Sequence, residues 1–182
     1  MTKNITESLA KMIEKGNEGL PLKNDVVKVG FKRLSDTAVI PTRAHESDSG
    51  FDLVANEDVI IEPGETKVIP TGIAVELPDG YEGQVRPRSG VTAKTKLRVQ
   101  LGTIDNGYTG EIGVIVDNIA SEGFSVDGVV YPLENIKKGT RIAQLVVQAL
   151  PEVTAFEVEE ISDSERGTAG FGSTGTTTKG RE

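Results

Sequence analysis

The chain has 182 residues and a formal net charge of −8 at pH 7, with 36% hydrophobic and only 4% aromatic residues. Its length fits one domain with short additions, and its modest hydrophobic content favours further burial against other subunits. The excess of acidic residues argues against binding of duplex DNA, because few Lys and Arg side chains are available to displace counterions. A small anionic ligand, which needs only a few local donors, remains compatible with this charge.

Two absences in the sequence narrow the class further. There is no cysteine, which excludes disulfides, thiolate metal sites and cysteine nucleophiles. No apolar run approaches the ~18 residues that a membrane span requires, and the N-terminus lacks the apolar region of a signal peptide. We therefore expect a cytoplasmic protein without membrane or nucleic-acid partners.

Residues 1–25 form an N-terminal extension with a pattern of their own. Asn4 and Glu7 have the spacing of a capping box, and apolar residues recur at helical spacing as far as Gly16. This pattern predicts either a short amphipathic helix over about residues 5–15 or a frayed tail. The sequence leaves both alternatives open.

Residues 26–161 consist of short apolar runs separated by turn residues at roughly ten-residue spacing. No long helical pattern lies between these runs, which is typical of an all-β sandwich, jelly roll or barrel. The strands are expected at residues 26–34, 59–61, 66–69, 73–77, 97–101, 112–116, 129–133, 141–147 and 156–161.

Two segments depart from this rhythm. Residues 119–138 contain the turn signals Ser121-Glu122-Gly123 and Asp127-Gly128, which predict an inserted hairpin. Residues 162–182 are rich in Gly, Ser and Thr and contain too few apolar residues for a core, so we expect a mobile C-terminal arm.

Acidic and hydroxyl side chains gather in AHESDSGFDL at residues 44–53, just ahead of an expected strand. Such a cluster could hold a hard cation, directly or through its waters. The alternative is a solvated turn. His45 is the only histidine of the chain, and we interpret it as a surface residue rather than a catalytic one.

The segment RPRSG at residues 86–90 places a guanidinium beside a hydroxyl and a glycine. Arginine offers a fork of donors to a phosphate, and glycine lets backbone amides approach an anion closely. The alternative is an ordinary basic loop.

A carboxylate, Asp105, and an aromatic ring, Tyr108, stand in a loop between two apolar runs, at residues 102–112. We predict a hairpin-like loop in which the carboxylate activates or orients a water and the ring packs under a sugar. A turn aspartate with a tyrosine at the rim is the alternative.

The segment GTRIAQL at residues 139–145 begins a strand. Alternation along a strand places Arg141 and Gln144 on opposite faces, so that one could bind ligand while the other braces the fold. The segment RGTAGFGSTG at residues 166–175 offers an arginine, hydroxyls, glycine amides and one aromatic ring, as a flexible phosphate cradle would. It is not a P-loop, because it lacks the GK[ST] sequence; a disordered tail is the alternative.

Taken in order, these five segments closely resemble the five motifs of the trimeric dUTP pyrophosphatase (dUTPase) family, over about residues 27–175. The resemblance implies a jelly-roll or distorted β-barrel homotrimer with three shared active sites and a mobile, glycine-rich C-terminal lid. It also implies hydrolysis of dUTP to dUMP and pyrophosphate with Mg²⁺, which limits uracil in DNA and supplies dUMP for dTTP synthesis.

The resemblance assigns roles to individual residues. Asp105 would activate the water that attacks the α-phosphorus in line, and Tyr108 would pack under the deoxyribose and reject a 2′-hydroxyl. Asp52 would meet Mg²⁺ through water, with the triphosphate supplying the direct ligands. The remaining substrate contacts would come from Arg88, Ser89, Gly90 and Gln144 at the phosphates, from Val99, Gly102, Thr103 and Ile104 at the uracil, and from Arg166, Phe171, Gly172, Ser173 and Thr174 in the lid.

The chain departs from the family pattern in places. Ala169 stands where the family usually has glycine, and Thr140 replaces a usual acidic residue. The N-terminal extension and residues 119–138 are additional, and the latter could bind a protein partner.

Two rival functions follow from the same residues. A dCTP deaminase-like enzyme of the same fold would need a glutamate in the strand at residues 113–117, which is absent. A trimeric regulatory or binding protein could act through residues 119–138, although all four of Asp105, Tyr108, Arg166 and Phe171 are retained.

Overall fold

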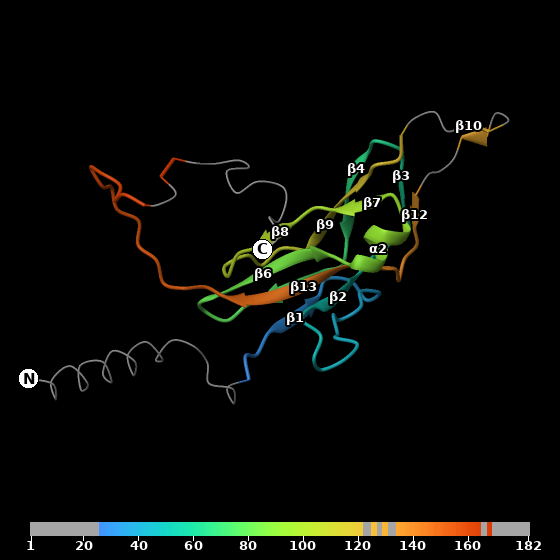
Figure 1. Cartoon of the computed structure of the whole chain (residues 1–182). Helices are drawn as coiled ribbons and strands as arrows, with labels where there is room; N and C mark the ends of the chain where they lie inside the picture. The colour runs from blue at the N-terminus through green and yellow to red at the C-terminus, as the bar shows by residue number, and fades with distance from the viewer. Residues whose placement is uncertain (1–25, 122–124, 127–128, 131–133, 165–166, 169–182) are drawn as a thin grey trace, which may run out of the picture. The chain divides into compact units, whose positions relative to one another are not determined.

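The computed structural model describes residues 26–121, 125–126, 129–130, 134–164 and 167–168. These residues form thirteen β-strands and a single six-residue helix, which confirms the predicted all-β class (Figure 1). The described residues contain no helix long and apolar enough to cross a membrane. The predicted N-terminal helix lies outside them, as does most of the C-terminal arm.

The strands are short and their bounds follow the turn signals. They are β1 (Gly30–Arg33), β2 (Phe51–Val54), β3 (Val59–Ile61), β4 (Thr66–Pro70), β5 (Ile73–Glu76), β6 (Tyr81–Pro87), β7 (Leu97–Val99), β8 (Gly102–Ile104), β9 (Gly113–Asn118), β10 (Ser125–Val126), β11 (Val129–Val130), β12 (Glu134–Ile136) and β13 (Arg141–Ala149), with α2 (Ser89–Lys94) after β6.

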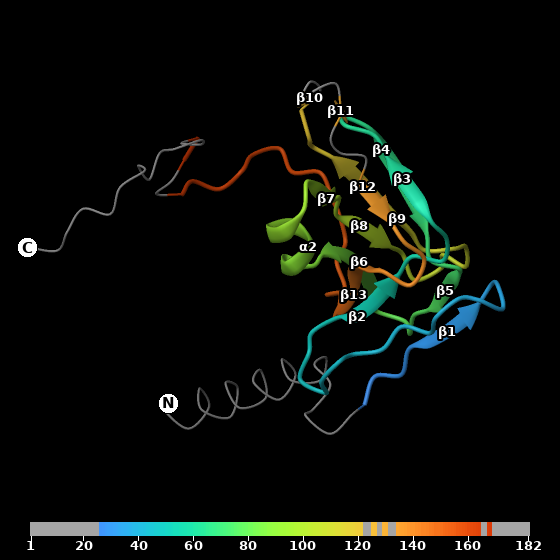
Figure 2. The ribbon, with the colours of Figure 1, turned by 90° about the vertical axis from the view of Figure 1, so that its right-hand side faces the viewer.

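The strands assemble into small antiparallel sheets. A four-stranded sheet has the order β2-β13-β6-β8, so that β13 runs between β2 and β6 (Figure 1). A three-stranded sheet has the order β4-β9-β7, and β1 pairs with β5, β3 with β12 and β10 with β11 (Figure 2). The β10-β11 pair confirms a hairpin within residues 119–138.

Alternation along the strands builds the core. In β9, Val114 and Val116 are buried while Ile115 between them is exposed. Each fully buried side chain of this kind stabilises the fold by about 1.5–3 kcal/mol. The two buried polar side chains among the described residues have hydrogen-bond partners: Asn118 Nδ2 donates to the Ile61 carbonyl at 2.9 Å and Thr71 Oγ1 to the Ile112 carbonyl at 2.7 Å. The largest fully buried apolar residues are Leu53, Ile61, Ile69, Ile73, Ile112, Ile142, Leu145, Val114 and Val116.

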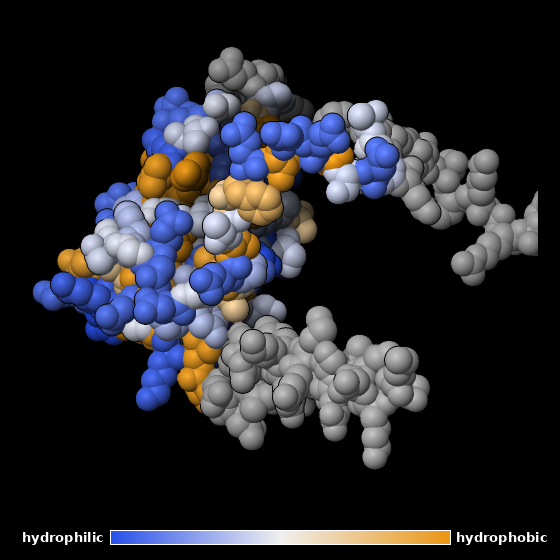
Figure 3. Space-filling view, turned by 90° about the vertical axis from the view of Figure 1, so that its left-hand side faces the viewer, coloured by the Kyte–Doolittle hydropathy of each residue, from blue (hydrophilic) through white to orange (hydrophobic). Residues whose placement is uncertain are grey.

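Not every apolar residue lies inside. Figure 3 shows apolar patches interrupting an otherwise polar surface, and the exposed apolar side chains of the strands and their connections include Val68, Leu101 and Ile115. Val68 and Ile115 are directly opposed in the β4-β9 register, so these two exposed side chains share one face of their sheet.

One predicted strand is wrong. Residues 156–161 alternate in sequence, but the structure has no strand there, and Phe156 is 81% exposed. Alternation produces a strand only where a neighbouring strand supplies hydrogen-bond partners, and described residues 152–163 have no backbone ladder. They belong to a unit of their own, which begins at Glu152.

Candidate active site

Three adjacent strands bring polar side chains together in one row. In the register of the four-stranded sheet, Gln144 of β13 stands opposite both Asp52 of β2 and Arg86 of β6. Directly opposed residues share a face of the sheet, so the three side chains project the same way. They line a cleft of about 420 Å³ together with Arg88, Ser89 and others from Ala44 to Val146, which we call the phosphate cleft.

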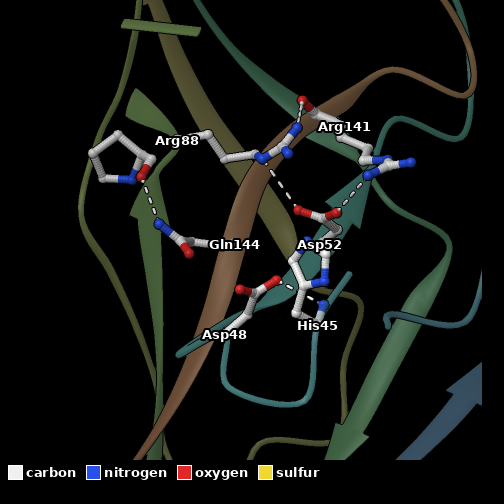
Figure 4. Close-up of polar contacts among 7 residues, drawn as sticks. His45, Asp48, Asp52, Arg88, Arg141 and Gln144 are labelled. Carbon is white, nitrogen blue, oxygen red and sulfur yellow. Dashed lines mark hydrogen bonds and ion pairs between the residues drawn. The ribbon is translucent and has the colours of Figure 1, made fainter. Parts of the chain in front are cut away.

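The Asp52 carboxylate lies at the centre of an ion-pair network (Figure 4). Its Oδ1 is 3.1 Å from Arg88 Nε and its Oδ2 is 3.1 Å from Arg141 Nη1. Arg88 Nη1 also donates to the Arg141 backbone carbonyl at 3.1 Å. Only 17% of the Asp52 side chain is exposed, so these two cations compensate a carboxylate that is largely removed from water.

Arg141 lies on the side that strand alternation did not predict. Alternation places Arg141 and Gln144 on opposite faces, whereas in the register with β2 Arg141 stands opposite Val54 and Gln144 opposite Asp52, two positions of one face. The Arg141 guanidinium reaches the Asp52 carboxylate, and the Gln144 amide points to the Pro87 carbonyl (Figure 4). The β13-β2 register shifts between Arg141 and Ala143, and Ile142 and Ala143 are both buried. This β-bulge inserts one extra residue and thereby returns Arg141 to the face of Gln144.

Gln144 is held in place by its neighbours. Its Nε2 donates to the Pro87 carbonyl at 3.0 Å. A Cβ on Gly50 would lie 2.7 Å from Gln144 Oε1 and 3.0 Å from Gln144 Cβ, so any other residue at position 50 would force the Gln144 side chain to move. The glycine of the first segment therefore supports the glutamine of the fourth.

Ser89 and Gly90 begin α2, directly after Arg88, whose backbone is extended. Ser89 lines both the phosphate cleft and an adjacent hollow, and Gly90 lines only the adjacent hollow. Nothing lies within 4 Å of a Cβ built on Gly90, so no described neighbour requires glycine there.

Asp105 and Tyr108 occupy the loop after β8. Both are exposed, and with Thr103, Ile104 and other residues they line a second hollow of about 340 Å³. Tyr108 Oη donates to the Glu111 carbonyl at 2.9 Å, and a Cβ on Gly110 would collide with that hydroxyl at 2.5 Å. The ring orientation is thus set by the loop itself.

This loop is not the predicted hairpin. β8 pairs with β6 in one sheet, whereas β9 pairs with β4 and β7 in another, so residues 105–112 connect two sheets. Asn106 anchors the connection, since its Nδ2 donates to the carbonyls of Leu77 at 2.9 Å and Pro78 at 2.8 Å. The sequence analysis did not single out Asn106, although an Asn-Gly pair directly after Asp105 is a turn signal.

The two hollows lie apart within one chain. Asp105 follows Ile104, which pairs with Gly83 of β6, and Arg88, extended directly after the end of β6, lies five residues beyond Gly83. At about 3.3 Å per residue this separation is roughly 17 Å. A single chain therefore does not bring Asp105 to the phosphate cleft.

The residues predicted to read a base lie on edge strands. Gly102, Thr103 and Ile104 form β8, the last strand of its sheet, so that one edge of its backbone is left without a strand partner in the described residues. Val99 ends β7, the edge strand of another sheet, and its side chain is buried. The predicted lid residues lie outside the described part of the chain: Arg166, Phe171, Gly172, Ser173 and Thr174.

Comparison with known proteins points to one family. The dUTPase family model matches residues 36–175. A deoxyuridine 5'-triphosphate nucleotidohydrolase of Clostridium kluyveri is 47% identical over 147 residues, which cover 80% of this chain and 96% of the relative. A second, of Clostridioides difficile, is 47% identical over 146 residues, covering 79% and 95% of the two chains.

Solved structures agree with the sequence relatives. The dUTPase of Staphylococcus bacteriophage 80alpha with dUpNHpp is 38% identical, has a TM-score of 0.74, and matches 82% of this chain and 99% of its own. A mutant dUTPase from phage phi11 of S. aureus, described with a structural Mg(II) ion, is 33% identical with a TM-score of 0.66 and covers 73% and 97%. These likenesses confirm the predicted jelly-roll architecture.

Proposed function

The chain belongs to the dUTPase family, and on this premise we propose that it hydrolyses dUTP to dUMP and pyrophosphate. The observation that carries the proposal is the phosphate cleft, where Arg88, Ser89 and Gln144 converge beside Asp52. A guanidinium, a hydroxyl and an amide together match the oxygens of a triphosphate. The dCTP deaminase alternative is not favoured by the relatives, which are nucleotidohydrolases acting on deoxyuridine triphosphate.

We assign the metal to the substrate rather than to a site built by the protein. The described residues contain no group of three or more His, Cys, Asp or Glu side chains that could hold an ion. Asp52 alone offers a carboxylate at the phosphate cleft, and each of its oxygens keeps a lone pair beside its arginine partner. This donor set fits Mg²⁺ that keeps its waters and takes direct ligands from phosphates, so that Asp52 would contact a metal-bound water. When bound, Mg²⁺ would neutralise phosphate charge.

Asp105 is the proposed general base. An exposed carboxylate on an anchored loop can take a proton from a water and orient that water toward the α-phosphorus. The Arg88 guanidinium would stabilise the charge that develops on the phosphate oxygens, while the attack and the departure of pyrophosphate proceed in line. The Tyr108 ring, fixed through its hydroxyl, would lie under the deoxyribose and leave no room for a 2′-hydroxyl.

The site would be completed by other copies of the chain. Since Arg88 lies roughly 17 Å along the strand from the position that pairs with Ile104, the residue before Asp105, we place the Asp105 loop of one copy over the phosphate cleft of another, in a homotrimer with three shared sites. Residues 162–182 would close over the bound nucleotide through Arg166, Phe171, Ser173 and Thr174. A protein partner for residues 119–138 and a cytoplasmic location remain predictions of the sequence.

Isotope labelling tests the reaction itself. Hydrolysis of dUTP with Mg²⁺ in H₂¹⁸O, followed by ³¹P NMR, is expected to yield dUMP and pyrophosphate with the heavy oxygen in dUMP. Label in pyrophosphate would show attack on the β-phosphorus, and release of dUDP would show a different enzyme class.

A further inference from the structure

Arg141 is an exposed arginine that a specific backbone irregularity directs to one partner. Its side chain is 56% exposed, and its only side-chain partner among the described residues is Asp52. An ion pair this exposed on one side adds little stability. The position of Arg141 is therefore better explained by an effect on the geometry of the cleft than by an effect on the stability of the fold.

The β-bulge is the device that brings Arg141 to Asp52. The register shift between Arg141 and Ala143 interrupts regular pairing between β13 and β2. Without the extra residue, Arg141 would project from the face opposite Gln144. Bulges beside functional clefts commonly re-aim a side chain in this way.

Arg141 acts on Arg88 at two points. Its backbone carbonyl accepts a hydrogen bond from Arg88 Nη1, and its guanidinium holds the Asp52 carboxylate that forms an ion pair with Arg88 Nε. A guanidinium is planar, so fixing Nε and Nη1 also fixes the direction of Nη2. Arg88 Nη2 has no hydrogen-bond partner in the described part of the chain, and Arg88 lines the phosphate cleft.

Loss of the Arg141 side chain would change this geometry. Asp52 would keep Arg88 as its single cation, and both carboxylate oxygens would be available to it. Bidentate pairing is the arrangement that arginine and carboxylate prefer, and it would turn the Arg88 guanidinium toward Asp52. The donor that faces the cleft would then be drawn away from it.

We propose that Arg141 is a positioning residue that orients the Arg88 guanidinium for phosphate binding before the nucleotide arrives. The inference rests on the proposed function in that the ligand of Arg88 is taken to be the triphosphate. It goes beyond that function by assigning the orientation of Arg88 to Arg141, a residue beside the bulge that need not touch the substrate.

The first test measures binding of dUpNHpp by calorimetry. Arg141→Gln is expected to weaken binding about tenfold, and Arg141→Lys, which keeps a cation near Asp52, to restore most of the loss. Arg33→Gln, which removes an exposed arginine of β1, is the matched control and should bind as the parent protein does.

A double-mutant cycle shows whether Arg141 acts through Arg88. In an Arg88→Gln background, Arg141→Gln should cost almost nothing further, because the group that it positions is gone. Equal losses in both backgrounds, or unchanged binding by Arg141→Gln alone, would overturn the proposal.

A second readout does not depend on the nucleotide. The Arg88 Nε–H resonance, assigned by its loss in Arg88→Lys, should exchange slowly in the parent and measurably faster in Arg141→Gln. Absence of dUpNHpp binding by the parent would count against the proposed function alone. An Arg88 Nε–H resonance unaffected by Arg141→Gln would reject the positioning role whatever the ligand is.

Discussion

Gly50 lies so close to Gln144 that a Cβ on residue 50 would come within 2.7 Å of Gln144 Oε1 and 3.0 Å of Gln144 Cβ. The two residues are more than ninety positions apart in the sequence: Gly50 directly precedes β2, and Gln144 lies in β13. Their contact couples the acidic loop to the strand that supplies the amide of the phosphate cleft.

Gly50→Ala should therefore displace Gln144 and break its 3.0 Å hydrogen bond to the Pro87 carbonyl. A displaced Gln144 would lose its contact to the phosphates, and one such hydrogen bond of about 1.4 kcal/mol corresponds to a roughly tenfold rise in KM for dUTP. Steady-state kinetics measures this, with Gly30→Ala as the control for a glycine replacement that crowds a neighbouring side chain, Glu76, away from the cleft. An unchanged KM for Gly50→Ala would show that Gln144 does not hold the phosphates.

Subunit mixing tests the site that is shared between copies. Asp105→Asn and Arg88→Ala should each lose turnover, the first by about 10²–10⁴-fold as expected for a missing general base. In trimers assembled from equal amounts of both variants, about a quarter of the sites would pair an intact Asp105 loop with an intact phosphate cleft. Activity should recover to that fraction of the parent.

No recovery in mixed trimers would place Asp105 and Arg88 in the same chain's site. Mixed trimers of Asp105→Asn with Asp36→Asn, a change of an exposed turn carboxylate, provide the control for assembly. They should show the activity expected from the fraction of intact Asp105 loops.

Tyr108 should determine discrimination against ribonucleotides. Tyr108→Ala removes a ring that is 46% exposed and oriented by the Glu111 carbonyl, so the ratio of kcat/KM for dUTP over UTP should fall by at least tenfold. Tyr108→Phe keeps the ring and should retain most of the selectivity. Equal selectivity in the parent and in Tyr108→Ala would place the sugar elsewhere.

Removal of residues 162–182 should leave the β-domain folded, because the first structural unit ends at Pro151. Turnover of dUTP should fall by about 10²-fold or more if the arm closes over the nucleotide and excludes water. Circular dichroism and size-exclusion chromatography check the fold and the assembly. Full activity after truncation would reject the lid.

The sequence predicted the strands whose alternation of apolar and polar residues matches a neighbouring strand that pairs with them in the fold. Val114 and Val116 alternate with an exposed residue, and β9 forms where alternation indicates. β6 was missed because Gly83 and Pro87 both disfavour strands. In the structure Gly83 fits closely between its neighbours, since a Cβ there would lie 3.0 Å from Leu145 Cδ1 and 3.2 Å from Ile104 Cβ and would press on both.

The site was predicted from motif order, and its geometry was not. No local rule indicates a bulge at Arg141, because a bulge depends on how β13 pairs with β2. Nor does the sequence show that Asp105 and Arg88 stand at opposite ends of a strand pair. The strand predicted at residues 156–161 is absent for the same reason, because a strand forms only where a second segment is placed to pair with it.

The most direct test of the account is release of pyrophosphate from dUTP, dTTP, dCTP and UTP in parallel, each with Mg²⁺ and with EDTA. The account predicts rapid release from dUTP alone and its loss with EDTA. Pyrophosphate release from dTTP or UTP at the rate seen with dUTP would contradict this function. So would the absence of release from all four nucleotides by a folded trimer.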